Sequence, residues 1–173
     1  MGAERYTGGK TKASTKSHLV EEPVVVYGGQ AGATINPIIL SGAAKKPESH
    51  MTPFEKIDII NEGVSKKDLE NLKLKSGLDY DQLAKALSVA RATLINKKRN
   101  ERFNSSLSEK IVGLADIYSY GYEVFEDEER FNEWVFRPNQ SLGGYSPYDL
   151  LDNQFGREEV RNLIGRIDYG VYS

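Results

Sequence analysis

A basic segment in the middle of the sequence carries the side chains best suited to contact nucleic acid. Between residues 85 and 110 only Glu101 and Glu109 are acidic, whereas the cations are Lys85, Arg91, Lys97, Lys98, Arg99, Arg102 and Lys110. Cationic side chains neutralise phosphates, and an arginine fork or an asparagine amide can pair with a base edge. The segment therefore has the chemistry for DNA binding, although a basic run at a helix end can also be simply solvated. The net charge of −2 does not reveal this basic segment, because residues 116–159 are predominantly acidic and offset its charge.

The apolar residues around this segment have the spacing of a helix-turn-helix. They are Leu83, Ala84 and Leu87 on a first helix, and Leu94 and Ile95 on a second. Ala84 is small enough for the two helices to cross closely, and Val89 in the turn fills their junction. The second helix is expected over residues 90–99, although Ala90 stands where a capping hydroxyl is usual.

In such units the N-terminal part of the second helix enters the major groove. Arg91, Thr93 and Asn96 are therefore expected to meet base edges, with Arg91 suited to a guanine and Asn96 to an adenine. The later cations are expected to hold phosphates, which orient the protein without specifying sequence. These are Lys97, Lys98, Arg99 and Arg102.

Helix signals fill the rest of the chain from residue 52 onward, so the fold class is expected to be all-α. Predicted N-caps are Thr52, Ser65, Asp79, Ser106, Asp127 and Ser146. Gly63 and Gly77 suit helix ends, and Pro138 stops the helix that follows Asp127. The helix after Ser146 is expected to include Phe155, and a last helix is expected to begin near residue 156.

Residues 1 to about 50 are rich in Gly, Ser, Thr, Ala and Lys and show no helical periodicity. A flexible, largely disordered N-terminal extension is expected here. The apolar stretches Val24–Tyr27 and Ile35–Leu40 leave a hairpin or an edge strand open as an alternative.

Several classes of protein are disfavoured by composition. The chain has no cysteine and two histidines, both in the N-terminal extension, so neither a metal site nor a metalloenzyme is expected. The acidic run at residues 126–129 stands at a helix start, where carboxylates complement the helix dipole, and no catalytic constellation accompanies it. We expect no enzyme activity and no cofactor. No stretch is apolar enough to span a membrane, so a cytoplasmic protein is expected.

The C-terminal half carries a long motif, W-x-x-x-P-N-x-x-L-G-G-x-S-P, which runs from Trp134 to Pro147. With the ending Ile164–Tyr172, it resembles the toxin-binding domain of the Xre/MbcA/ParS antitoxins. The resemblance extends from about Thr52 to Ser173 and includes the helix-turn-helix. It departs from the family in having valine and phenylalanine after Trp134, and Ser88 where the turn usually has glycine.

This resemblance implies an antitoxin that binds a RES-domain toxin, an enzyme that destroys NAD, and that represses its own operon by binding operator DNA. It implies a DNA-binding domain over residues 51–125 and a small helical toxin-binding domain over residues 126–173. A homodimer is expected because symmetric operators are read by two-fold dimers. The alternative is a free-standing regulator whose C-terminal domain dimerises or senses a ligand.

The residues expected to contact the toxin lie in the glycine loop and at the chain's end. They are Leu142, Gly143, Gly144, Tyr145, Arg166, Tyr169, Gly170, Val171 and Tyr172. The tail from Arg166 onward is expected to plug the toxin's active site, since a guanidinium fork fits a site built for a cofactor phosphate. Trp134 is expected to serve the core instead.

Overall fold

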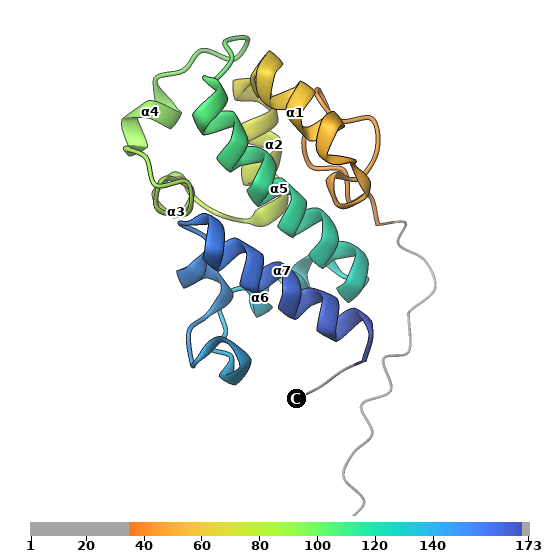
Figure 1. Ribbon diagram of the computed structural model, residues 1–173. Helices are drawn as coiled ribbons and strands as arrows, with labels where there is room; N and C mark the ends of the chain where they lie inside the picture. Colours follow the sequence, from red (N-terminus) through yellow and green to blue (C-terminus); the bar gives the residue numbers. More distant parts are fainter. Residues whose placement is uncertain (1–34, 171–173) are drawn as a thin grey trace, which may run out of the picture. The chain divides into compact units, whose positions relative to one another are not determined.

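The computed structural model describes residues 35–170, and its regular elements in this range are helices (Figure 1). They are η1 (Glu48–His50), α1 (Pro53–Glu62), α2 (Lys66–Ser76), α3 (Tyr80–Ala86), α4 (Arg91–Ile95), α5 (Ser105–Phe125), α6 (Glu128–Trp134), η2 (Gln140–Leu142), η3 (Pro147–Leu150) and α7 (Gln154–Asp168), where η marks a 3-10 helix. The extended pairing in the described part amounts to an isolated bridge between Ser65 and Arg102. The all-α prediction is confirmed.

Local capping signals set most of these helix starts. Thr52 and Asp79 each form a capping box with the residue three positions on, and Ser65 and Asp127 accept hydrogen bonds from the first turns of α2 and α6. The prediction for α5 was wrong by two residues. Its N-cap is Asn104, whose side chain accepts from the Leu107 amide at 2.9 Å. Asparagine is as good a cap as serine.

The 21-residue helix α5 organises the core. It runs between α1 and α7 in Figure 1 and also contacts α2 and α6. Apolar residues recur along it at helical intervals, and all are buried apart from the half-buried Phe125; they are Leu107, Ile111, Leu114, Tyr118, Tyr122 and Phe125. Tyr118 and Tyr122 on α5 meet the Phe131 ring of α6 edge-on at 5.4 and 5.6 Å. These aromatic contacts fix α6 against α5.

The prediction of a disordered extension was wrong for residues 35–50. Ile39 and Leu40 are fully buried, and the buried Glu48 carboxylate accepts from their backbone N–H groups at 3.0 and 2.6 Å. Apolar burial and satisfied backbone groups therefore make this segment part of the core. Residues 1–34, which include Val24–Tyr27, lie outside the described range.

The elements after Pro138 also differ from the predicted ones. The helix that begins after Ser146 is the single short 3-10 element η3, and α7 begins at Gln154 with Asn153 as its cap. Phe155 therefore belongs to α7, where 79% of its surface is exposed. None of the helices in residues 35–170 has the length and apolar character needed to cross a membrane.

Candidate functional site

The predicted helix-turn-helix is formed by α3 and α4, but α4 is shorter than expected. It covers Arg91–Ile95 instead of residues 90–99. The chain turns after Asn96, and a tight turn closes with the Glu101 amide donating to the Lys98 carbonyl at 3.0 Å. Lys98 and Arg99 therefore lie in a loop that follows the helix, where they are exposed.

The turn between these helices has an unusual backbone. Ser88 adopts a φ of 50°, in the left-handed region that a glycine would occupy without strain. Its hydroxyl donates to the Asp152 carbonyl at 2.7 Å. Val89 is half-buried against the core, and its amide donates to the Ala84 carbonyl at 3.0 Å. Ala90 caps α4 without a side-chain hydrogen bond.

The predicted DNA contacts differ in how far their side chains are held by the rest of the protein. Arg91, Thr93 and Asn96 are exposed, and Arg91 forms an ion pair with Asp81 at 3.1 Å. The Lys97 ammonium lies 5.7 Å from the centre of the Phe103 ring. Arg102 differs from the others, because its guanidinium donates to the Gly63 carbonyl at 2.6 Å and so joins two segments of the fold.

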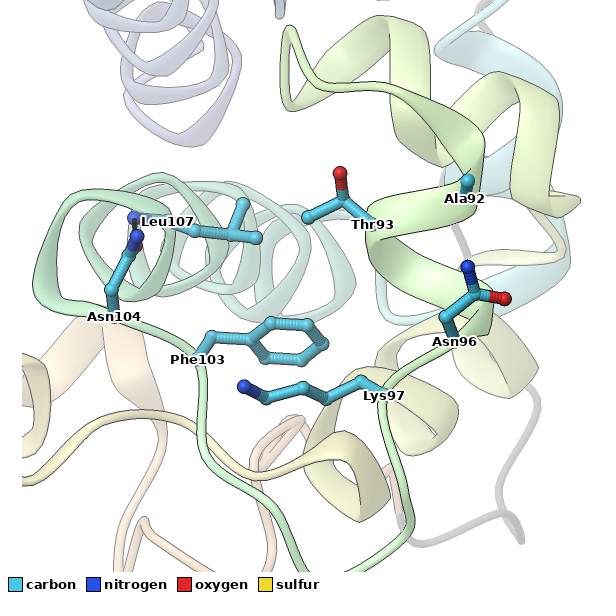
Figure 2. A pocket seen from close by; sticks show the side chains of 7 residues that line it. All are labelled: Ala92, Thr93, Asn96, Lys97, Phe103, Asn104 and Leu107. Atoms are coloured by element: carbon cyan, nitrogen blue, oxygen red, sulfur yellow. Dashed lines mark hydrogen bonds between the residues drawn. The ribbon is translucent and has the colours of Figure 1, made fainter.

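A groove of about 450 Å³ opens between α4 and the start of α5 (Figure 2). Its α4 side is formed by Ala92, Thr93 and Asn96, and the other lining residues are Lys97, Phe103, Asn104 and Leu107. Figure 2 shows the Phe103 ring between the Lys97 and Leu107 side chains. Sequence reasoning found Thr93, Asn96 and Lys97 but missed Phe103 and Asn104, whose roles depend on how α5 packs beside α4.

Lys66 is a further residue that the sequence did not single out. Its side chain is buried, and its ammonium donates to the Tyr80 hydroxyl and to the Leu94 carbonyl, both at 2.7 Å. The ammonium also lies 4.4 Å from the centre of the Tyr80 ring. A cation at the carbonyl end of a helix is favourable, so Lys66 secures the last turn of α4 from behind.

The glycine loop between α6 and η3 is closed by its own backbone. The Asn139 amide donates to the Tyr145 carbonyl at 3.0 Å, and the Gly144 amide donates to the Asn139 carbonyl at 2.9 Å. Gly143 and Gly144 have φ values of 68° and 87°, which L side chains rarely adopt. Both glycines and Tyr145 are exposed, whereas Leu142 is buried, so Leu142 supports the loop from inside.

The predicted contacts at the chain's end are only partly described. Arg166 is half-buried on α7, and Tyr169 and Gly170 are exposed. Val171 and Tyr172 lie outside the described residues. Trp134 is half-buried and stacks on Phe131 with ring centres 5.5 Å apart, which agrees with the core role expected for it.

Comparisons with known proteins cover both the helix-turn-helix and the C-terminal part that contains the glycine loop. Residues 55–116 match the model of the antitoxin Xre-like helix-turn-helix domain, and residues 121–170 match that of the antitoxin Xre/MbcA/ParS C-terminal toxin-binding domain. The chain belongs to the Xre/MbcA/ParS antitoxin family. This is a family of antitoxins and not of enzymes, and its C-terminal domain gives the antitoxin a toxin as partner.

Individual relatives of the antitoxin agree with this assignment. A Prs ADP-ribosylating antitoxin from Sphingobium sp. strain YBL2 is 28% identical over 70% of the chain and 83% of its own length. An antitoxin Xre from Yersinia enterocolitica is 27% identical over 68% of the chain and 80% of its own length. A Photorhabdus laumondii antitoxin Xre is 32% identical over 42% of the chain and 49% of its own.

The two matched domains of the antitoxin meet inside one helix. The first match ends at residue 116 and the second begins at residue 121, and both positions lie in α5 (Ser105–Phe125). A continuous helix transmits orientation in a way that a flexible linker cannot. The helix-turn-helix and the toxin-binding domain therefore share a rigid element.

Proposed function

We propose that this antitoxin silences a RES-domain toxin, a NAD-degrading enzyme, by blocking its active site with the C-terminal region, and that it binds operator DNA through α4. The toxin half is supported by the match to the toxin-binding domain together with the exposed loop Gly143–Tyr145. Exposed tyrosines suit protein interfaces, since they bury a large area at little entropic cost. Tyr145 and Tyr169 are 60% and 82% exposed.

The blocking segment begins at Arg166 and continues through the tail. A planar guanidinium offers paired N–H donors to the groups of an active site that otherwise hold a cofactor phosphate or carboxylate. Tyr169 and Gly170 extend this segment beyond α7, and the left-handed φ of 67° at Gly170 redirects the chain where the helix ends. Tail residues 171–173 are proposed to complete the plug.

Truncation tests this arrangement. Asp168 should be retained, because its carboxylate accepts from the Tyr120 hydroxyl at 3.1 Å and so helps to hold α7 on α5. An antitoxin lacking residues 169–173 should still bind the toxin but no longer protect cells that co-express it. Arg166→Ala should weaken protection more than Arg166→Lys, because lysine keeps the charge and loses the fork. Full protection by the truncated protein would overturn the blocking role.

The DNA half is supported by the helix-turn-helix match and by the cations around α4. A fragment of the antitoxin's own promoter should shift in a mobility assay, and the shift should weaken steeply as salt rises. Arg91→Ala should relax base preference, whereas Lys98→Ala should weaken all sequences alike. If no shift were seen at low salt, the proposed operator binding would be contradicted. If the two substitutions had equal effects, the proposed division between base-reading and phosphate-binding residues would be contradicted.

The antitoxin is proposed to act as a homodimer, because a two-fold dimer matches the two half-sites of a symmetric operator. Light scattering on the purified chain should return twice the mass of one chain. A monomer mass at micromolar concentration, with undiminished promoter binding, would contradict this part of the proposal.

A further inference from the structure

Three groups of the toxin-binding domain directly contact the DNA-binding unit, by which we mean α3, the turn at Ser88 and α4. The Tyr148 hydroxyl donates to the Gln82 carbonyl at 3.1 Å, and Asp149 lies 3.4 Å from the Lys85 ammonium. The Asp152 carbonyl accepts from the Ser88 hydroxyl at 2.7 Å. We call this set of Tyr148, Asp149 and the Asp152 carbonyl the interdomain strut. Its three contacts reach the first turn of α3 at Gln82, the last turn at Lys85 and the turn that follows at Ser88.

Contacts within the toxin-binding domain hold the residues of the strut in place. The Tyr148 amide donates to the Val135 carbonyl at 2.9 Å, and the Tyr148 ring lies 4.9 Å from the Phe136 ring. On its other side the Lys85 ammonium lies 4.9 Å from the centre of the same ring. Asp149 is fixed by the Ser146 hydroxyl, which donates to it at 2.6 Å. The strut therefore presents groups of defined position to α3.

The DNA-binding unit needs such support because its own local interactions do little to stabilise α4 and the turn before it. The α4 helix has five residues, too few to be stable alone, and its cap makes no side-chain hydrogen bond. Ser88 holds a backbone conformation that is unfavourable for a residue with a side chain. Strained turns persist only where surrounding contacts over-determine them. The Ser88 hydroxyl, bound to the Asp152 carbonyl, provides one of these contacts.

We propose that the interdomain strut positions α3 and the turn for sequence-specific DNA binding, so that Tyr148 and Ser88 are positioning residues for DNA recognition by the antitoxin. This inference rests on the proposed operator binding and adds a role for the toxin-binding domain in it. Strut contacts fix the direction in which α4 leaves the turn. They act on base reading, which depends on orientation, and leave phosphate contacts of the loop cations largely unaffected.

The test measures binding of the full chain to two duplexes, a fragment of its own promoter and a scrambled fragment of equal length and composition. Tyr148→Phe and Ser88→Ala each remove one hydroxyl of the strut contacts. Each should weaken promoter binding by about two- to tenfold, the range of one hydrogen bond, and leave scrambled-duplex binding unchanged. Tyr120→Phe is the matched control, since it removes a phenol hydrogen bond between α5 and α7.

Ser88→Gly distinguishes loss of the hydroxyl contact with Asp152 from backbone strain in the turn as the cause of weaker promoter binding. Glycine also lacks the hydroxyl but adopts a positive φ freely, so Ser88→Gly should be more stable than Ser88→Ala while binding the promoter as weakly. Recovery of promoter affinity in Ser88→Gly would overturn the proposal, because turn strain would then explain the loss. Equal promoter affinity of Tyr148→Phe, Tyr120→Phe and the unchanged chain would also overturn it.

These outcomes are distinct from failure of operator binding itself. If the unchanged chain bound promoter and scrambled duplexes equally, the proposed operator binding would fail and the strut's role with it. If the unchanged chain preferred the promoter and the strut variants kept that preference, only the positioning role would fail.

Discussion

The side-chain Nε of Arg91, the first residue of α4, lies 3.1 Å from Asp81 Oδ1 in the first turn of α3. Both side chains are more than half exposed, so the pair is worth little to stability. The residue expected to read a guanine is nevertheless partly neutralised by its own protein. A DNA phosphate or base must compete with Asp81 for the guanidinium.

Asp81→Asn should therefore tighten DNA binding. The substitution keeps the side-chain shape, frees Arg91 and removes a negative charge that repels phosphates. We expect a gain of about two- to fivefold in affinity at about 50 mM salt, and a smaller gain at higher salt because the effect is screened. Fluorescence anisotropy with a labelled promoter fragment measures it. Glu133→Gln, which breaks the exposed pair with Arg137, is the control; unchanged affinity in Asp81→Asn would show that this ion pair does not restrain Arg91.

Gly121 allows the close approach of α5 and α6. A Cβ at this position would overlap the Phe131 ring, which is itself fully buried. Gly121→Ala should lower the free energy of unfolding by about 2 kcal/mol, because overpacking outweighs the better helix propensity of alanine. Chemical denaturation measures the change.

Gly165→Ala is the matched control for this substitution. It lies in the last turn of α7, where an added Cβ would meet the Tyr120 hydroxyl oxygen at an ordinary contact distance of 3.6 Å. This variant should gain up to about 1 kcal/mol from helix propensity. Equal effects of the two substitutions would contradict a specific clash at Phe131.

The sequence is most informative where one short segment determines the structure. Asp79 caps α3 as predicted, in a capping box with Gln82 three residues on. The apolar stripe of α5 likewise follows from helical spacing. These features depend on neighbours along the chain, which makes them visible in sequence.

The features that sequence reasoning misses join distant segments. Composition places Glu48 in a flexible extension, yet its carboxylate binds the backbone of Ile39 and Leu40 inside the core. Lys66 has the position of a solvated helix residue, yet it reaches the Leu94 carbonyl. The predicted α4 is too long because the turn at Lys98–Glu101 depends on how the chain returns to α5. Tertiary contacts override local propensity at such positions.

Tyr118 should tolerate loss of its hydroxyl. The side chain is fully buried, and the hydroxyl has no hydrogen-bond partner among the described residues. An unpaired buried hydroxyl carries a desolvation cost, so Tyr118→Phe should leave the free energy of unfolding unchanged or raise it by up to about 1 kcal/mol. Thermal and chemical denaturation measure this.

Tyr122→Phe provides the contrast on the same helix. The Tyr122 hydroxyl lies 2.7 Å from the Lys75 carbonyl oxygen and 2.9 Å from Asn132 Oδ1, and it donates its proton to one of them. Its loss should lower the free energy of unfolding by about 1 kcal/mol. If Tyr118→Phe were destabilising to the same degree, the Tyr118 hydroxyl would have a partner such as an internal water.

Glu48 should make stability depend on pH. Burial raises the pKa of its carboxyl above the ordinary value of 4.5, against the opposing effect of the Leu40 and Ile39 amides. The folded state therefore holds this proton more tightly than the unfolded state does. The resulting stabilisation is fully present below the pKa of the unfolded chain, and it is lost as pH rises through the raised pKa of the folded state.

Glu48→Gln removes this titration and retains one oxygen that can accept from the backbone amides. The free energy of unfolding of the unchanged chain should therefore fall relative to that of Glu48→Gln as pH rises from the ordinary pKa of 4.5 through the raised pKa of the folded state, because the buried carboxylate becomes charged over this range. Urea denaturation at intervals across the range measures the difference, with the exposed Glu133→Gln as control. A difference that grew in favour of the unchanged chain as pH rose would mean that the amides of Ile39 and Leu40 outweigh the burial and hold Glu48 ionised in the core. A constant difference would mean that the two effects cancel, and it would equally contradict the prediction.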